Sequence, residues 1–215
     1  ILRVLDRVAK GYVLRRDFAL SAGGGQIFHP LTSTSTLSIY IALKRGVLQL
    51  FASPRQQPEA VIAEGVGPGD CWRFSGATAH VGIVLAEPIF ITHVSIDHIP
   101  RTFTSNIRTA PKDMVLWGVV EGQSNIEALT SRTPRIPVTW NSKVNTSAPF
   151  LGDGRQLFPL ASFTYDIEAY FHVQTFRVWN GPRTSDVDIG VVILEVLSNW
   201  GEADTCLYRV RIHGD

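Results

Sequence analysis

The sequence predicts an all-β protein, an antiparallel β-sandwich preceded by one short N-terminal helix. At 215 residues the chain has the length of a single large β domain that can bury a substantial core. Most of it consists of short runs rich in β-branched and aromatic residues, bounded by Gly, Pro, Asn and Asp. Many short strands separated by such turn residues are typical of sandwiches.

The helix is predicted within residues 1–20, where Leu5, Val8 and Tyr12 recur at helical spacing. A helix this short is marginal alone in water, so it either folds back on the domain or associates with copies of itself as a truncated coiled coil. We favour self-association because the apolar pattern runs up to the first residue. Residues 1–16 are therefore expected to be the remnant of a coiled-coil stalk, or a helical extension, of a longer protein. "SAGGGQ" then ends the helix, since glycine permits the positive φ of a sharp turn.

The strands of the sandwich are predicted from runs that share a high content of Val, Ile and aromatic residues: 81–99, 114–120, 161–167, 171–179, 189–200 and 206–212. Two other segments do not have the character of core strands. Residues 36–53 alternate in polarity before the turn-prone "SPRQQPEA", which predicts a projecting hairpin. Residues 121–156 combine prolines with small polar residues, which predicts a long surface insertion.

Composition and motifs exclude several classes of function. Lys and Arg number 20 and Asp and Glu number 19, so no basic field would hold a nucleic-acid backbone. No apolar run reaches the roughly 18 residues of a membrane span. His93 and His98 face opposite sides of a strand and cannot share a metal ion, and no nucleophile elbow or phosphate-binding loop is present. Hydrolase chemistry is therefore unsupported by the motifs.

Composition alone does not decide the structure of two features of the sequence. The two cysteines, Cys71 and Cys206, are either a disulfide or two buried thiols, because a lone pair of cysteines is no disulfide framework. The glycine-rich stretch "VIAEGVGPGDCW", residues 61–72, is either a plain turn or a loop whose carbonyl groups ring a cation.

Six blocks of sequence carry a resemblance to a known family: "DFALSAGGGQI" (17–27), "PGDCWRF" (68–74), "DHIPRT" (97–102), "TAPKDMVLWG" (109–118), "FTYD" (163–166) and "SNWGEADTCLYRVRIHG" (198–214). In order and approximate spacing they resemble the SUN domain. That resemblance implies that residues 17–215 are a β-sandwich that trimerises through an upstream coiled coil. It also implies a place in the nuclear envelope lumen, anchored to the inner nuclear membrane, and binding of the C-terminal tails of outer-membrane KASH proteins in a LINC bridge from nucleus to cytoskeleton.

The resemblance further implies a disulfide between Cys71 and Cys206, which an oxidising lumen would sustain. In the family this bond closes a loop that holds a monovalent cation, which we expect to be potassium, through backbone carbonyls. The corresponding residues are Ala60, Ala63, Gly65 and Asp70, with Tyr208 nearby. Animal members carry Gln and Asp in place of Ala63 and Gly65, so loop shape rather than side-chain identity would decide binding here.

The family's KASH lid, a hairpin that grips an extended peptide, corresponds to residues 36–58. Strand addition of this kind uses main-chain hydrogen bonds and pockets for alternate side chains. The apolar lid candidates are Leu37, Ile39, Ile41, Leu43, Val47, Leu48, Leu50 and Phe51. The alternative is an ordinary edge hairpin packed on its own domain. The terminal carboxylate and prolines of the peptide are expected near His98, Thr109 and Tyr208, where Thr109 replaces a serine of animal members and Tyr208 offers an aromatic face and a phenol.

Three positions depart from the family pattern. Asp204 stands where an aromatic residue is common, and a carboxylate there would repel an anionic peptide end unless it points away. Thr32 stands where some animal members have a cysteine that bonds to the KASH tail, so attachment here should be noncovalent. The insertion 121–156 is longer than in animal SUN domains.

Two alternative functions are also compatible with the sequence. One is a SUN-like protein of the endoplasmic reticulum without KASH partners, and the other is a β-sandwich that binds carbohydrate or glycoprotein. Five tryptophans include candidate stacking platforms for a sugar, although core packing also accounts for them: Trp72, Trp117, Trp140, Trp179 and Trp200.

Overall fold

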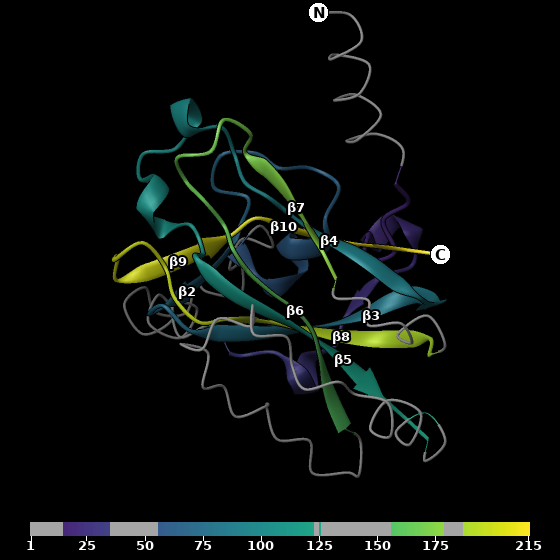
Figure 1. Cartoon of the computed structure of the whole chain (residues 1–215). Helices are drawn as coiled ribbons and strands as arrows, with labels where there is room; N and C mark the ends of the chain where they lie inside the picture. The colour runs from purple at the N-terminus through teal and green to yellow at the C-terminus, as the bar shows by residue number, and fades with distance from the viewer. Residues whose placement is uncertain (1–14, 35–55, 123–124, 126–155, 179–186) are drawn as a thin grey trace, which may run out of the picture.

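The computed structural model describes residues 15–34, 56–122, 125, 156–178 and 187–215. Within these ranges the chain is built from antiparallel β-sheets joined by short 3₁₀ turns, so the predicted β-sandwich is confirmed (Figure 1). The predicted N-terminal helix, the apolar lid candidates and nearly all of the surface insertion lie outside the described residues. No helix in the described ranges is long and apolar enough to cross a membrane.

The larger sheet has five strands in the order β1-β3-β8-β5-β6. Their bounds are Gln26–Ile27 for β1, Ala79–Ile89 for β3, Ile189–Val196 for β8, Asp113–Val120 for β5 and Gln156–Thr164 for β6. All neighbours pair antiparallel, and β5 lies between β6 and β8 with Leu116 opposite both Ala161 and Leu194. β5 is buried along nearly its whole length, whereas β8 is buried at Ile189, from Val192 to Leu194 and at Val196.

Two smaller sheets complete the fold. One contains β10 (Arg209–Gly214), β4 (Ile91–Asp97) and β7 (Val173–Arg177) in that order, and the other pairs β2 (Trp72–Ser75) with β9 (Asp204–Leu207). The 3₁₀ helices in the described ranges are η1 (Ser21–Gly23), η2 (His29–Leu31), η5 (Pro58–Ile62), η6 (Arg101–Phe103) and η7 (Ile107–Thr109). Side chains from all three sheets, including Trp72, Met114, Leu194 and Ile212, pack into one buried cluster.

Two of the predicted runs divide where the chain passes from one sheet to another. The run 81–99 breaks at Phe90, so that β3 belongs to the large sheet and β4 to the three-stranded sheet. The run 206–212 breaks at Tyr208, between β9 and β10. A residue at such a break leaves the ladder of one sheet before joining the next.

The first described residues join the far end of the chain. Phe18 N–H donates to Ile212 C=O at 2.9 Å, and Ala86 N–H donates to Phe18 C=O at 2.9 Å. The glycine run that follows turns the chain back, and of its three glycines Gly24 alone has positive φ, at 109°. Gly25 is required for a different reason, since any Cβ there would collide with the backbone of Ala19. The segment before β1 is therefore fixed between β3 and β10.

Candidate functional site

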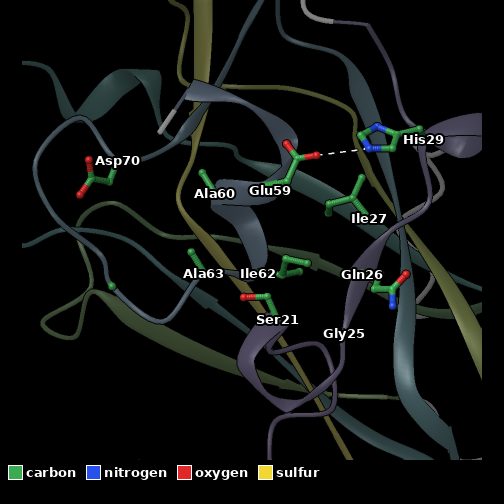
Figure 2. A pocket seen from close by; sticks show the side chains of 11 residues that line it. Ser21, Gly25, Gln26, Ile27, His29, Glu59, Ala60, Ile62, Ala63 and Asp70 are labelled. Atoms are coloured by element: carbon green, nitrogen blue, oxygen red, sulfur yellow. Dashed lines mark ion pairs between the residues drawn. The ribbon is translucent and has the colours of Figure 1, made fainter. Parts of the chain in front are cut away.

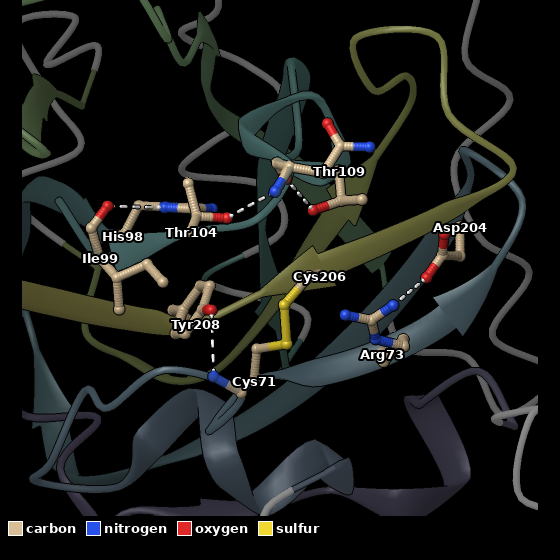
Figure 3. Close-up of a disulfide and its surroundings, with 11 residues drawn as sticks. Cys71, Arg73, His98, Ile99, Thr104, Thr109, Asp204, Cys206 and Tyr208 are labelled. Carbon is tan, nitrogen blue, oxygen red and sulfur yellow. Dashed lines mark hydrogen bonds and ion pairs between the residues drawn. A yellow bond between two sulfur atoms is a disulfide. The ribbon is translucent and has the colours of Figure 1, made fainter. Parts of the chain in front are cut away.

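A disulfide between Cys71 and Cys206 lies at the centre of the candidate site (Figure 3). Cys71 immediately precedes β2 and Cys206 lies on β9, and these strands pair with Trp72 opposite Leu207. The two Cα atoms are 5.5 Å apart, within the usual span for a disulfide. Both cysteines are buried, so the bond that the family resemblance implied is present and enclosed.

Tyr208 and His98 pack against each other beside this disulfide. Their ring centroids are 4.6 Å apart in an edge-on arrangement. Gly69 N–H donates to the Tyr208 hydroxyl oxygen at 3.4 Å. Burial raises the pKa of Tyr208, which keeps it a phenol with its own proton. The Gly69 hydrogen bond uses the hydroxyl oxygen as an acceptor, which leaves its proton to donate.

His98 is neutral and presents an unused acceptor. Burial lowers its pKa, and its Nδ1 lies 3.0 Å from the carbonyl oxygen of Ile99. Since a carbonyl accepts, Nδ1 carries the proton and Nε2 has a lone pair. Nε2 is buried and lacks a hydrogen-bond partner in the described ranges. A buried unpaired nitrogen is costly, which makes it a plausible contact for an N–H or O–H group of a ligand.

Thr109 lies on η7 in the same region of Figure 3, above the Cys206 strand. Its hydroxyl donates to Asn106 C=O at 2.9 Å, so it can offer only lone pairs to a ligand. The structure therefore brings His98 and Tyr208 into direct contact and places Thr109 near them. All three side chains are buried in the single chain, at 2%, 4% and 8% exposure for His98, Tyr208 and Thr109.

The predicted cation-loop residues line a cavity of about 740 Å³ (Figure 2). Ala60 lies on η5, and Ala63, Gly65 and Asp70 follow it in the loop that leads to Cys71. The opposite wall comes from the segment around β1, and His29 and Glu59 approach to 3.2 Å across it. Val66 of the loop packs on the other side, against the cluster of Cys71, Ile99, Cys206 and Tyr208. The loop thus separates the cavity from the disulfide.

The two departures that the structure describes have clear surroundings. The Asp204 carboxylate is paired with Arg73 on the neighbouring strand, with 2.5 Å between Oδ2 and Nη1. Its charge is therefore balanced locally. The Thr32 hydroxyl donates to Phe28 C=O at 2.9 Å and accepts from Gly82 N–H at 3.1 Å, so it fastens η2 to β3.

Sequence reasoning assigned no role to Asp17 and Arg209. The Arg209 side chain donates to Asp17 Oδ2 and to Glu64 C=O, each at 2.8 Å, and thereby connects the start of the domain with the loop. Both residues lie in the quoted blocks 17–27 and 198–214, so their position in recurrent motifs was a signal. Their pairing was not readable, because 192 residues separate them.

Of the five tryptophans considered as stacking platforms, two are core residues and two lie outside the described ranges. Trp72 and Trp117 are buried and cannot serve as stacking platforms, whereas Trp200 is half-buried with the Lys112 ammonium 4.7 Å from its ring centroid. Trp140 and Trp179 are outside the described residues. In the described ranges no three His, Cys, Asp or Glu side chains come together as metal ligands.

Comparison with solved structures defines the class of fold. A family 32 carbohydrate-binding module from Streptococcus pneumoniae EndoD aligns with a TM-score of 0.53 and 10% identity, covering 93% of this chain and all of that one. An F5/8 type C domain from Bacteroides fragilis aligns with a TM-score of 0.52 and 8% identity, covering 89% of this chain and 92% of that one. At these identities the likeness shows a shared β-sandwich architecture and nothing about ligands.

The sequence comparisons establish the family. The family model described as Sad1 / UNC-like C-terminal matches residues 51–133 and 152–215. SUN domain-containing protein 1 of Homo sapiens is 31% identical over 93% of this chain, and SUN domain-containing protein 5 of Homo sapiens is 28% identical over 99%. The chain belongs to the SUN domain family. It spans 21% and 47% of the length of these two relatives.

Proposed function

We propose that this domain is a noncatalytic module of the nuclear envelope lumen that binds the C-terminal tail of a KASH protein and so contributes to a LINC bridge. The observation that carries the proposal is the contact between Tyr208 and His98 beside the Cys71–Cys206 disulfide, in a chain that belongs to the SUN domain family. Three separate segments supply polar groups there, which suits recognition of a chain terminus.

The chemistry divides between the three side chains. Tyr208 has a phenolic proton to donate and is the group best suited to a terminal carboxylate. His98 Nε2 and the Thr109 hydroxyl offer lone pairs, which suit main-chain N–H groups of the peptide. Asp204 does not oppose an anionic terminus with its full charge, because Arg73 balances it.

Burial of these groups requires movement before a peptide reaches them. Loop 63–70 lies over Tyr208 through the Gly69 contact and through Val66. Displacing this loop would expose the phenol of Tyr208. The remaining walls of the groove would come from the lid 36–58 and from neighbouring protomers of a homotrimer in the full-length protein. The apolar lid candidates remain a prediction.

A potassium ion bound to the loop is part of the proposal. Each backbone carbonyl has two lone pairs, and the loop adds the Asp70 carboxylate beside the cavity. Ala60, Ala63, Gly65 and Asp70, which line the cavity, would hold a monovalent cation through such oxygens. Bound to the loop, the ion would supply a fixed positive charge near the peptide terminus.

The decisive experiment measures mass in solution by light scattering and peptide affinity by fluorescence anisotropy. The peptide is proline-rich and ends as a KASH tail does, and the same peptide with an amidated terminus is the comparison. We expect binding of the free acid and at least tenfold weaker binding of the amide, since a charge-assisted hydrogen bond contributes about 1.5–3 kcal/mol. Equal binding of both forms would contradict carboxylate recognition, and a glycan array would then test the carbohydrate-binding alternative.

Tyr208→Phe provides a sharp variant because it removes the phenolic donor and keeps the ring. Its matched control is Tyr165→Phe, which removes the hydroxyl that donates to His172 C=O at 2.9 Å. Both tyrosines are buried, so both variants should lose comparable stability. The proposal requires that only Tyr208→Phe lower the affinity for the free-acid peptide.

A further inference from the structure

The two ends of loop 63–70 are held by two consecutive residues. The Tyr208 hydroxyl accepts from Gly69 N–H, and Arg209 Nη1 donates to Glu64 C=O at 2.8 Å. Next to the Gly69 anchor, Asp70 N–H also closes a turn on Gly67 C=O at 3.0 Å. The position of the loop over Tyr208 therefore depends on the orientation of the Arg209 guanidinium.

That orientation is set from the other side by Asp17. Arg209 Nη2 donates to Asp17 Oδ2 at 2.8 Å, and both side chains are less than one-tenth exposed. Asp17 Oδ1 accepts from the backbone N–H groups of Ala19 and Ile212, at 3.1 and 3.2 Å. The carboxylate is thus fixed to the segment that enters the domain and to β10 at the same time.

The third guanidinium nitrogen of Arg209, Nε, supports the interpretation that Asp17 and Glu64 set the orientation of this side chain. Nε is buried and has no hydrogen-bond partner in the described ranges. An unsatisfied buried donor costs free energy, so the guanidinium is turned to suit its two outer nitrogens at the expense of the inner one. A planar fork can reach two acceptors at once, which a lysine ammonium on one flexible stem does far less well.

We propose that Arg209 is a positioning residue that holds loop 63–70 over Tyr208, and that Asp17 fixes Arg209, so that segment 15–19 and the loop move as one unit. The consequence is regulatory: a displacement of the chain where it enters the sandwich changes how firmly the loop covers the site. The effect of this displacement on peptide binding rests on the proposed function, whereas the mechanical link between segment 15–19 and the loop does not.

Hydrogen exchange followed by NMR tests the link in the full chain. The variant is Arg209→Lys, which keeps a positive charge for Asp17 and loses the second arm to Glu64. The matched control is Arg211→Lys on the same strand, since Arg211 directs its nitrogens to the buried Asp97. We expect the amides of Gly69 and Asp70 to exchange about tenfold faster in Arg209→Lys and to be unchanged in Arg211→Lys. Amides of β8 report global unfolding, and the comparison is made relative to them.

Asp17→Asn tests whether Asp17 holds the Arg209 side chain in place. Oδ1 remains to accept from Ala19 and Ile212, while the charge that holds Arg209 is lost. Exchange at Gly69 and Asp70 should again accelerate, although the hydrogen bonds of the Asp17 carboxylate go to Ala19, Arg209 and Ile212 and not to the loop. Unchanged loop exchange in Asp17→Asn, or equal acceleration in Arg211→Lys, would overturn the proposal. Failure of the unaltered chain to bind the KASH-type peptide would refute the proposed function. The exchange rates would still test the link between Asp17, Arg209 and the loop.

Discussion

Arg73 and Asp204 form an ion pair across β2 and β9, and each lies two residues along the chain from a cysteine of the Cys71–Cys206 disulfide. Arg73 lies opposite Cys206 in the ladder, and its guanidinium reaches along the strand to the carboxylate. An acidic residue beside a site proposed for an anionic peptide end is thereby balanced within the domain.

The first prediction concerns this pair. Arg73→Gln should leave the Asp204 carboxylate unbalanced and weaken binding of a free-acid peptide about three- to tenfold at low salt, while stability changes by less than about 1 kcal/mol because both side chains are partly exposed. Anisotropy titrations at low and high ionic strength measure the effect. Arg73→Lys should bind as the unaltered chain does. A loss that persists at high salt would show that Arg73 acts through shape and not through charge.

The disulfide should contribute substantially to stability. It joins residues 135 positions apart, and in the chain-entropy model a loop of that length adds up to about 5 kcal/mol to the free energy of unfolding. The paired variant Cys71→Ser with Cys206→Ser should lose most of this in urea denaturation. A reductant should destabilise the unaltered chain and have no effect on the double variant. Equal denaturation midpoints for the two chains under oxidising conditions would contradict the prediction.

Stability should fall as the pH drops below about 6.5. Burial lowers the pKa values of His98 and His213 beneath their ordinary value. The folded state therefore keeps these imidazoles neutral while the unfolded chain binds protons, so stability is full above pH 6.5 and each group removes up to about 1.4 kcal/mol per pH unit below it. Urea titrations between pH 7.5 and 5.5, above the range of the carboxylates, measure the slope.

His98→Gln separates the two contributions to this slope. His213 is part of a buried chain in which its Nδ1 donates to Arg16 C=O and its Nε2 accepts from Ser95. The variant should keep that chain and flatten the dependence on pH. An unchanged slope would assign the whole effect to His213 or to other groups.

Two neighbouring glycines should respond differently to the same substitution. Gly25→Ala puts a methyl group into the backbone of Ala19 and should cost about 1–3 kcal/mol, whereas Gly23→Ala meets its nearest atom at 3.9 Å and should be nearly neutral. Thermal unfolding of the two variants measures the difference. Similar melting temperatures would mean that the turn before β1 adapts freely.

Local patterns were sufficient for most of the sandwich. The run 114–120 and the start of the run 189–200 are continuous apolar segments, and they form the central strands β5 and β8. The breaks at Phe90 and Tyr208 were not predicted, because the passage from one sheet to another depends on long-range pairing and leaves little trace in composition. β2 was quoted as part of a motif and not identified as a strand for the same reason.

The family resemblance named candidate site residues, and their contacts could not be read from the sequence. The family resemblance supplied Cys71, Cys206, His98 and Tyr208, and the structure places them together. It could not indicate that Arg73 balances Asp204, or that Arg209 reaches Asp17, since each pair is joined across more than 130 residues. Which nitrogen of His98 holds the proton follows only from the carbonyl that it faces.

The disulfide also sets how far this chain can be stretched. A bond between Cys71 and Cys206 makes the intervening 135 positions a covalent ring, and about 80 of the 215 residues remain outside it. At about 3.5 Å per extended residue, the ends of the oxidised chain can be drawn roughly 280 Å apart, against roughly 750 Å after reduction. Most of the contour length, including β3, β4, β5 and β8, is thus withheld from a pulling force even if the sandwich unfolds, and the redox state of one bond decides the reach of the whole domain.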